Sequence, residues 1–114
     1  MQGEALSVPN CSLVLCTAPP EAADALARRI VQERLAACVN LLPGVISHYL
    51  WKGRAETSGE TLLLIKTTAE RVTDLIAAIP RWHPYELPEV IAVEIRDGLP
   101  PYLRWLAEGS SPGA

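Results

Sequence analysis

The chain has 114 residues, of which 49% are hydrophobic and 20% are charged, and its formal net charge is −3 at pH 7. This length suits one compact domain and is too short for two. The weak acidic charge excludes the basic footprint of a nucleic-acid-binding protein, and no apolar run is long enough to cross a membrane as a helix. We therefore expect one globular domain with neither nucleic acid nor membrane as a partner.

The chain has three cysteines, Cys11, Cys16 and Cys38. An odd number of cysteines without a signal peptide favours free thiols in a reducing compartment, so we expect a cytoplasmic protein. Residues 1–10 lack the basic and apolar segments of a secretion signal. These residues and residues 109–114 are predicted to be flexible tails, which leaves residues 11–108 as the domain.

The first predicted strand covers residues 12–17 and contains an unbroken apolar run at residues 13–16. Such a run is typical of a central strand that is buried on both faces. Pro19 and Pro20 end the strand and open a helix, because proline is tolerated in the first helical turn. Acidic residues near the helix start and arginines further along complement the helix macrodipole. We expect this helix to end near Ala37.

The second strand is predicted at residues 39–51, with a bend or bulge at residues 43–44, which are Pro and Gly. Lys52 and Gly53 are a turn signal. Residues 54–60 are polar, and residues 61–67 form the third predicted strand. The two strands and their turn make a long hairpin.

A capping box is predicted at the start of the second helix, with Thr67 as the N-cap and Glu70 at the third helical position. Apolar residues recur at helical spacing from Val72 to Ile79, and Pro80 and Pro84 are expected to end the helix. A fourth strand follows at residues 90–95. A short helix at residues 100–106 completes the chain.

The predicted order of elements is β-α-β-β-α-β with a short terminal helix. This is the order of the ferredoxin-like α+β fold. In that fold the sheet has the strand order 4-1-3-2, and all neighbouring strands are antiparallel. The end of the first strand therefore lies beside the start of the fourth, and the hairpin projects from the same edge.

This topology brings Cys16 close to the segment 82–89, which reads Trp-His-Pro-Tyr-Glu-Leu-Pro-Glu. The two prolines restrict the backbone of this segment. A thiolate, the imidazole of His83 and the carboxylates of Glu86 and Glu89 make a candidate metal cluster. Sulfur and imidazole ligands favour copper or zinc. His48 is a weaker candidate ligand on the second strand.

Structural interpretations of the same residues stay open. Cysteine is among the most buried residue types, so Cys16 is also explained as a small core residue. His83 is also explained as a loop histidine bound to a backbone carbonyl, and the two glutamates as solvated loop residues. A Cys-His pair can also serve as nucleophile and base, but no third orienting group or phosphate-binding loop accompanies it, so we expect no enzyme.

Seven segments then stand out by their order and spacing, at residues 15–19, 33–40, 43–44, 49–53, 65–68, 83–89 and 102–106. Together they resemble the CutA family, the divalent-cation tolerance proteins. The resemblance implies a ferredoxin-like protomer that assembles as a homotrimer, similar in architecture to the PII signalling proteins. In that family the long hairpin and the C-terminal segment help bind neighbouring subunits. The residues that we predict for a ligand cleft or interface are Tyr49, Trp51, Lys66, Trp82, Tyr85 and Trp105.

The resemblance also implies divalent-metal binding and a link to copper tolerance, with Cys16 and His83 at the positions usually implicated. Some members carry a second histidine directly before His83, where this chain has Trp82, so one ligand is lost. Glu86 or Glu89 is the predicted replacement, with copper or zinc as the ion. The alternative function is that of a PII-like trimeric sensor or scaffold. Such a protein binds a small ligand or a protein partner in the cleft between subunits.

Overall fold

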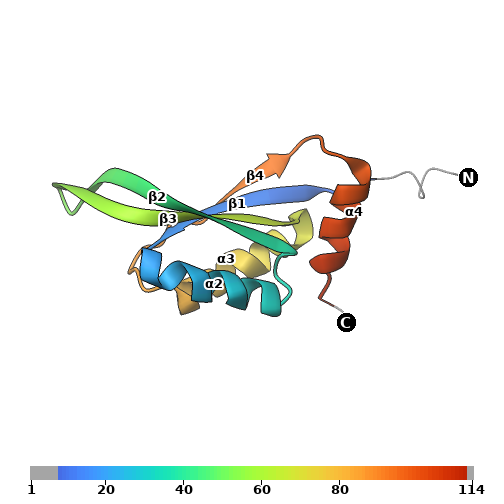
Figure 1. The fold of residues 1–114 in the computed structure, drawn as a ribbon, viewed down its shortest axis with the longest axis horizontal. Helices are drawn as coiled ribbons and strands as arrows, with labels where there is room; N and C mark the ends of the chain where they lie inside the picture. The colour runs from blue at the N-terminus through green and yellow to red at the C-terminus, as the bar shows by residue number, and fades with distance from the viewer. Residues whose placement is uncertain (1–7, 113–114) are drawn as a thin grey trace, which may run out of the picture.

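The computed structural model describes residues 8–112. In chain order the elements are β1 (Cys11–Ala18), α2 (Pro20–Gln32), β2 (Cys38–Trp51), β3 (Arg54–Thr68), the 3₁₀ turn η1 (Ala69–Arg71), α3 (Val72–Trp82), β4 (Ile91–Ile95) and α4 (Pro100–Gly109). The predicted order β-α-β-β-α-β with a terminal helix is confirmed (Figure 1). Residues 1–7 and 113–114, which belong to the predicted tails, lie outside the described residues.

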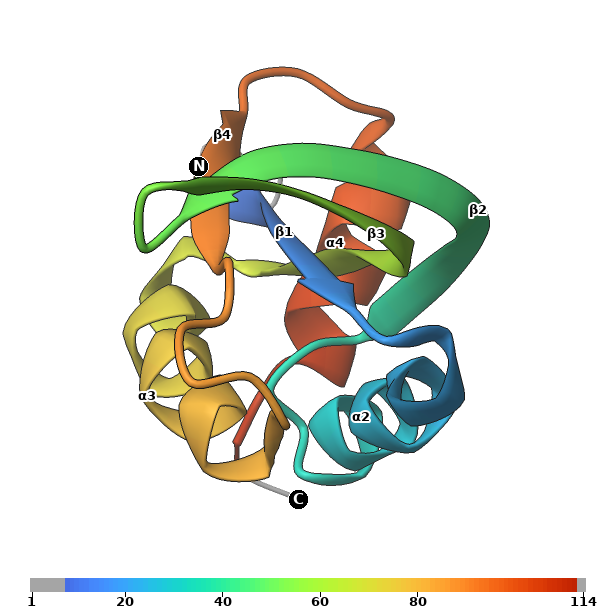
Figure 2. The same ribbon diagram turned by 90° about the vertical axis from the view of Figure 1, so that its left-hand side faces the viewer.

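The strands form one antiparallel sheet in the order β2-β3-β1-β4, as predicted. Helices α2 and α3 cover one face of this sheet, and α4 lies near the start of β1 (Figures 1 and 2). In the pairing of β1 with β4, Leu15 lies opposite Ile91. The end of β1 therefore meets the start of β4, which is the juxtaposition that the topology predicted.

The main core lies between the sheet and the two helices α2 and α3. Its buried members are Val14, Cys16, Ala18, Ala23, Leu26, Ala27, Ile30, Leu35, Ala36, Leu63, Ile65, Leu75, Ala78 and Ile79. Burying one large apolar side chain contributes about 1.5–3 kcal/mol, so this cluster dominates the stability of the protomer. A smaller cluster joins Cys11 to Leu103 and Leu106 of α4.

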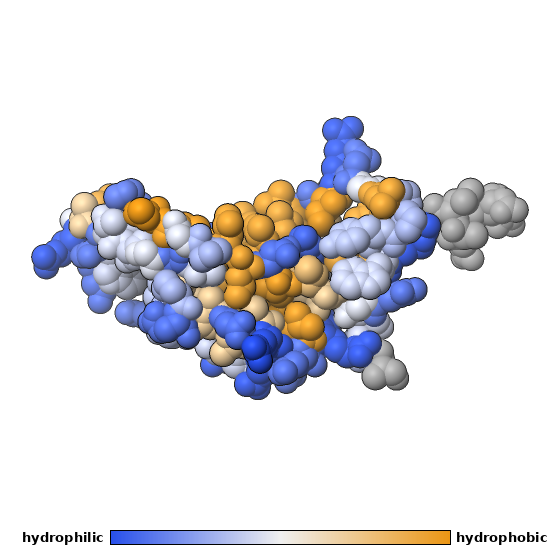
Figure 3. Space-filling view, in the orientation of Figure 1, coloured by the Kyte–Doolittle hydropathy of each residue, from blue (hydrophilic) through white to orange (hydrophobic). Residues whose placement is uncertain are grey.

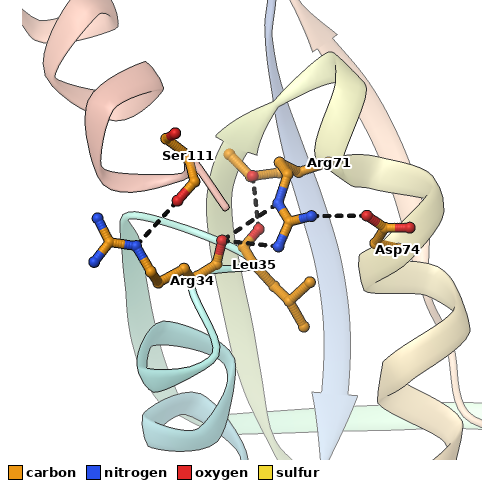
Figure 4. A network of polar contacts seen from close by, with 6 residues as sticks. Arg34, Leu35, Arg71, Asp74 and Ser111 are labelled. Atoms are coloured by element: carbon orange, nitrogen blue, oxygen red, sulfur yellow. Dashed lines mark hydrogen bonds and ion pairs between the residues drawn. The ribbon is translucent and has the colours of Figure 1, made fainter. Parts of the chain in front are cut away.

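Helix α2 ends at Gln32, earlier than the predicted end near Ala37. The reason is Arg34, which has a left-handed backbone with a φ of 60° and so cannot continue the helix. Its carbonyl oxygen accepts hydrogen bonds from Nε and Nη2 of Arg71, at 3.3 and 3.1 Å (Figure 4). Its own Nε donates to the carbonyl oxygen of Ser111 at 3.0 Å. These bonds join the α2–β2 turn to η1 and to the segment after α4.

The predicted capping box at Thr67 is wrong. Thr67 lies inside β3 opposite Ser12, and its hydroxyl donates to the carbonyl oxygen of Leu35 at 2.7 Å. The chain instead passes through η1 before α3 begins at Val72. The prediction failed because a buried threonine at a strand end has the same local sequence as an N-cap.

Pro80 does not end the second helix, since α3 includes it and continues to Trp82. The helix ends where His83 takes an extended backbone, with φ and ψ of −87° and 138°. The following Pro84 disfavours the helical conformation at His83 for steric reasons, so the prediction that Pro84 stops the helix is confirmed.

The hairpin is longer than predicted, because the polar residues 54–60 belong to β3. The predicted irregularity at residues 43–44 is confirmed by a register shift between Leu42 and Val45. The turn uses Lys52 and Gly53, with φ of 51° and 79°, a backbone that matches the twist of hairpin strands. Pairing of β1 with β3 stops at Ala18, so the hairpin extends beyond the rest of the sheet (Figure 1).

Helix α4 continues to Gly109, and Ser110 is buried. A Cβ atom on Gly109 would lie 2.6 Å from that of Ala37, so only glycine permits this close approach. Among residues 8–112, no helix is long and apolar enough to cross a membrane.

Large apolar side chains remain exposed on β2, β4 and α4. They are Leu41, Leu42, Ile46, Tyr49, Leu50, Ile91, Val93, Tyr102 and Trp105. Figure 3 shows apolar side chains gathered over the middle of the molecule, between the hairpin and α4. An exposed surface of this kind marks an interaction site more often than chance.

Candidate ligand site at the His83 loop

His83 lies at the end of α3 and points toward the end of β1. Only 7% of its surface is exposed. Its Nε2 lies 2.8 Å from the carbonyl oxygen of Thr17, which directly follows Cys16. The sequence therefore predicted correctly that the His83 loop and the end of β1 meet.

Both ring nitrogens of His83 have partners. The backbone N–H of Tyr85 donates to Nδ1 at 3.1 Å, so Nδ1 carries no proton. The Thr17 carbonyl can only accept, so Nε2 carries the proton and donates it. These partners define the neutral Nε2–H tautomer, in which neither nitrogen has a free lone pair.

Tyr85 connects the His83 loop to the hairpin. Its ring lies against the His83 ring with the centroids 4.8 Å apart, and its hydroxyl donates to Oε2 of Glu60 at 2.7 Å. The hydroxyl of Ser47 donates to Oε1 of the same carboxylate at 2.6 Å. Glu60 is 6% exposed. It is thus a buried carboxylate held by two hydroxyls, one from the loop and one from β2.

Burial and the negative charges near this cluster raise the pKa values of Cys16 and Tyr85. Burial, followed by the charges of Glu89 and Glu60, raises the pKa of the Cys16 thiol to about 12. Burial and the hydrogen bond to Glu60 raise the pKa of the Tyr85 hydroxyl. Cys16 and Tyr85 are therefore both neutral at physiological pH.

The predicted metal ligands do not fit a metal centre in this arrangement. A metal at His83 needs a free imidazole lone pair, whereas both ring nitrogens are engaged in hydrogen bonds. Glu86 and Glu89 are exposed. Within residues 8–112, no three His, Cys, Asp or Glu side chains gather closely enough to hold an ion. Metal binding by the predicted ligands stays a prediction, and it requires His83 to lose one of its two hydrogen bonds.

His48, the weaker candidate, directly follows Ser47 on β2 and pairs with Thr57 on β3. It is exposed, and its Nδ1 lies 3.0 Å from the hydroxyl oxygen of Thr57. Among residues 8–112, no group of three His, Cys, Asp or Glu side chains that could hold an ion includes His48.

The residues predicted for a cleft or interface fall into separate groups. Tyr49 lies on β2, with its hydroxyl oxygen 2.8 Å from that of Ser58 on β3. Lys66 lies 6.0 Å from the ring of Tyr102, which stacks on Trp105 at 5.6 Å. Trp51 lies at the hairpin turn beneath Lys52.

Trp82, the residue that replaces the second histidine of some relatives, lies away from the cluster. Its ring packs at the edge of the core, with the guanidinium of Arg29 4.5 Å and that of Arg81 5.8 Å from its centroid. The two arginines that contact its ring belong to α2 and α3 rather than to β1. The side chain before His83 therefore lies on a different surface from the Thr17 contact.

Sequence reasoning missed Glu60, Ser47 and the Thr17 carbonyl. Glu60 belongs to a polar stretch that was read only as a connection between strands. In the sequence, the burial of Glu60 was indicated only by its position directly before the apolar strand segment at residues 61–65. At that place, strand alternation puts a carboxylate beside the end of β1.

Two open hollows on the described part of the protomer lie away from the His83 loop. One, of about 400 Å³, lies between η1 and α4, and the other, of about 460 Å³, lies between α2 and β2. The contact between Glu60 and Tyr85 is a largely buried polar contact in the protomer.

The fold defines a ferredoxin-like α+β protein. The CutA1 divalent ion tolerance protein family matches residues 12–109. The divalent-cation tolerance protein CutA of Yersinia pestis (strain Pestoides F) is 46% identical over 103 residues, which cover 90% of this chain and 87% of that protein.

Two solved structures are similar throughout. The CutA structure from Xylella fastidiosa is 46% identical with a TM-score of 0.85, covering 89% of this chain and 98% of that one. The PII-like protein CutA from Nostoc sp. PCC 7120, in its apo form, is 34% identical with a TM-score of 0.83, covering 88% and 97%. This chain therefore belongs to the CutA1 divalent ion tolerance protein family, as its motifs predicted.

Proposed function

We propose that this protein acts in divalent-cation tolerance as a PII-like homotrimer that binds a small ligand or a protein partner between subunits, beside Tyr85 and Glu60. The observation that carries the proposal is an ordered polar cluster at the base of a long hairpin whose apolar residues have no cover in the protomer. We propose a binding role rather than a catalytic one.

Assembly is supported by the surface of the protomer. Ile46 and Leu50 on the hairpin are 68% and 76% exposed. Strands β2 and β4 are the two edges of the sheet, and each leaves one row of backbone groups unpaired within the described part of the chain. Contacts between two different surfaces of identical subunits form a closed ring when the rotation permits. A trimer of this kind covers the exposed edges and apolar residues together.

The position of the cluster supports a ligand site between subunits. Tyr85, Glu60 and Ser47 lie where the His83 loop meets the projecting hairpin. A neighbouring subunit that packs on the hairpin also approaches this point. The side chains there are hydroxyls and one carboxylate, which recognise polar or cationic groups through hydrogen bonds.

Direct copper or zinc binding by Cys16, His83, Glu86 and Glu89 remains a prediction, as does the cytoplasmic location. The family name supports a link to divalent cations. Both ring nitrogens of His83 are already hydrogen-bonded. This favours an indirect link to cation tolerance, in which the protein binds a ligand other than the metal ion.

Two measurements test the proposal. Sedimentation equilibrium should give three times the protomer mass, and a stable monomer would contradict the assembly. A thermal-shift screen of nucleotides, polyamines and divalent salts should find a compound that raises Tm, because a ligand of the folded state stabilises it. The rise should be lost in Tyr85→Phe and kept in the matched control Tyr102→Phe.

A further inference from the structure

We infer that His83 is a positioning residue that holds Tyr85 on Glu60, and that this role excludes a metal ion from the same imidazole. The inference goes beyond the proposed function and does not require its ligand to be known. It rests on one continuous chain of bonds, Thr17–His83–Tyr85–Glu60–Ser47.

The bond between His83 and Tyr85 closes a local ring. A side-chain acceptor on one residue receives the backbone N–H two residues on, as in an Asx-turn. Pro84 lies between the two residues and fixes its own φ. The ring therefore sets the direction in which Tyr85 leaves the loop, and the contact between the tilted rings of His83 and Tyr85 keeps that direction.

The bond between His83 and Thr17 fixes this local ring to the body of the protein. Thr17 lies in β1, the central strand that pairs with both β3 and β4. Without that bond, the remaining side-chain hydrogen bond from residues 83–85 to the sheet, among the described residues, is that of Tyr85 with Glu60 on β3. The latter bond joins the Tyr85 hydroxyl to a buried carboxylate that belongs to the hairpin.

Metal coordination competes with both bonds. An ion on Nδ1 would take the lone pair that accepts the Tyr85 N–H. An ion on Nε2 would need that nitrogen to lose its proton, which would leave the Thr17 carbonyl without its donor. The two functions of the ring are therefore mutually exclusive, and a cation bound at His83 would release Tyr85 from Glu60.

Two conservative variants separate the two bonds. In His83→Asn, the amide oxygen stands near the position of Nδ1 and keeps the ring with the Tyr85 N–H, but it does not reach Thr17. In His83→Gln, the longer amide reaches the Thr17 carbonyl but offers no acceptor at the Nδ1 position. Exchange of the Tyr85 amide hydrogen reports the first bond in each protein.

We expect Tyr85 amide exchange to be roughly fivefold to tenfold faster in His83→Gln than in the wild type. In His83→Asn it should stay within about twofold of the wild type. Equal exchange in the wild type and His83→Gln would overturn the inference.

The wild type supplies a test that needs no variant. Long-range ¹H–¹⁵N spectra should show a protonated Nε2 and an unprotonated Nδ1 on His83, unchanged by one equivalent of Zn(II) or Cd(II). A shift of the His83 nitrogens with the added ion, together with unchanged Tyr85 amide exchange, would show that the imidazole binds metal without losing its positioning role, and the inference would be wrong.

Discussion

The body of the protein and its projecting hairpin belong to the same sheet, but they differ in how far their apolar side chains are buried. In the body, β1 and the adjoining half of β3 bury their apolar residues under α2 and α3. Beyond Ala18, β2 and β3 continue as two strands alone and expose residues such as Ile46 and Leu50. A two-stranded ribbon is marginally stable in water by itself. The comparison teaches that the body is specified by its own core, whereas the hairpin depends on contacts outside the protomer.

The His83 loop lies at the border between these regions. Its contact with Thr17 belongs to the body, and the contact of Tyr85 with Glu60 belongs to the hairpin. Substitutions in the body and in the hairpin should therefore differ in their effects on protomer stability and on association.

The largest effect is expected from the core. Ile79→Ala removes a fully buried side chain and should lower the free energy of unfolding by about 2–5 kcal/mol. Leu50→Ala removes a similar side chain from the hairpin, where it is 76% exposed, and should leave protomer unfolding nearly unchanged while weakening association. Urea denaturation measures the free energy of unfolding, and sedimentation measures association. A large loss of protomer stability in Leu50→Ala would contradict the expected difference between the body and the hairpin.

The next largest effect concerns the Cys16 thiol at high pH. The pKa of Cys16 rises from an ordinary value of 9.0 to about 12, chiefly through burial. The unfolded chain therefore releases this proton between pH 9 and 12 while the folded chain keeps it, so stability should fall as pH rises through that window. Cys16→Ala should show a shallower fall.

Alkylation at pH 8 checks the burial of Cys16 within the body of the protein. Cys16 is fully buried, whereas Cys38, at the start of β2, is half-buried. Cys38 should react with iodoacetamide well before Cys16. Equal reaction rates would show that the end of β1 is open in solution.

A smaller effect is expected at the border itself. Tyr85→Phe removes one of the two donors to the buried Glu60 and should cost about 1–3 kcal/mol of protomer stability. The matched change Tyr49→Phe removes a hydroxyl that bonds only to Ser58 on the exposed hairpin, so it should cost about 0.5 kcal/mol or less. Similar costs at the two tyrosines would mean that the Glu60 contact contributes little.

The smallest effect concerns the two left-handed residues that are not glycine, Arg34 in the body and Lys52 at the hairpin turn. Such a backbone costs a non-glycine residue about 1 kcal/mol. Arg34→Gly should recover most of this cost but lose the bond to Ser111, for a net gain of about 0.5 kcal/mol, whereas Arg34→Ala should destabilise. Lys52→Gly should leave global unfolding unchanged, because the tip packs on nothing in the body. Thermal unfolding of the three variants checks this order.

Much of the fold could be predicted from local sequence. The apolar run in β1, the helical spacing in α3 and the turn at Lys52 predicted the elements. Their order then predicted the sheet, because few connections are sterically allowed. The end of α2 could not be predicted, since no glycine marks the left-handed turn at Arg34. The start of α3 was mistaken because the partner of Thr67 is Leu35, a residue distant in the sequence.

The sequence by itself determined the family, the strand order and the meeting of His83 with the end of β1, because these depend on periodicity, turn residues and motif spacing. The tertiary structure alone decided what His83 contacts there. Thr17, Tyr85 and Glu60 come from three separate segments, and nothing local to any of them marks its partner. Glu60 is buried where the His83 loop meets the hairpin, and the pKa values of Cys16 and Tyr85 are raised first by their own burial and then by neighbouring groups that include Glu60. A hydrogen bond between distant segments exists only once the core has fixed their positions, so the chemistry of this site follows from the packing of the body.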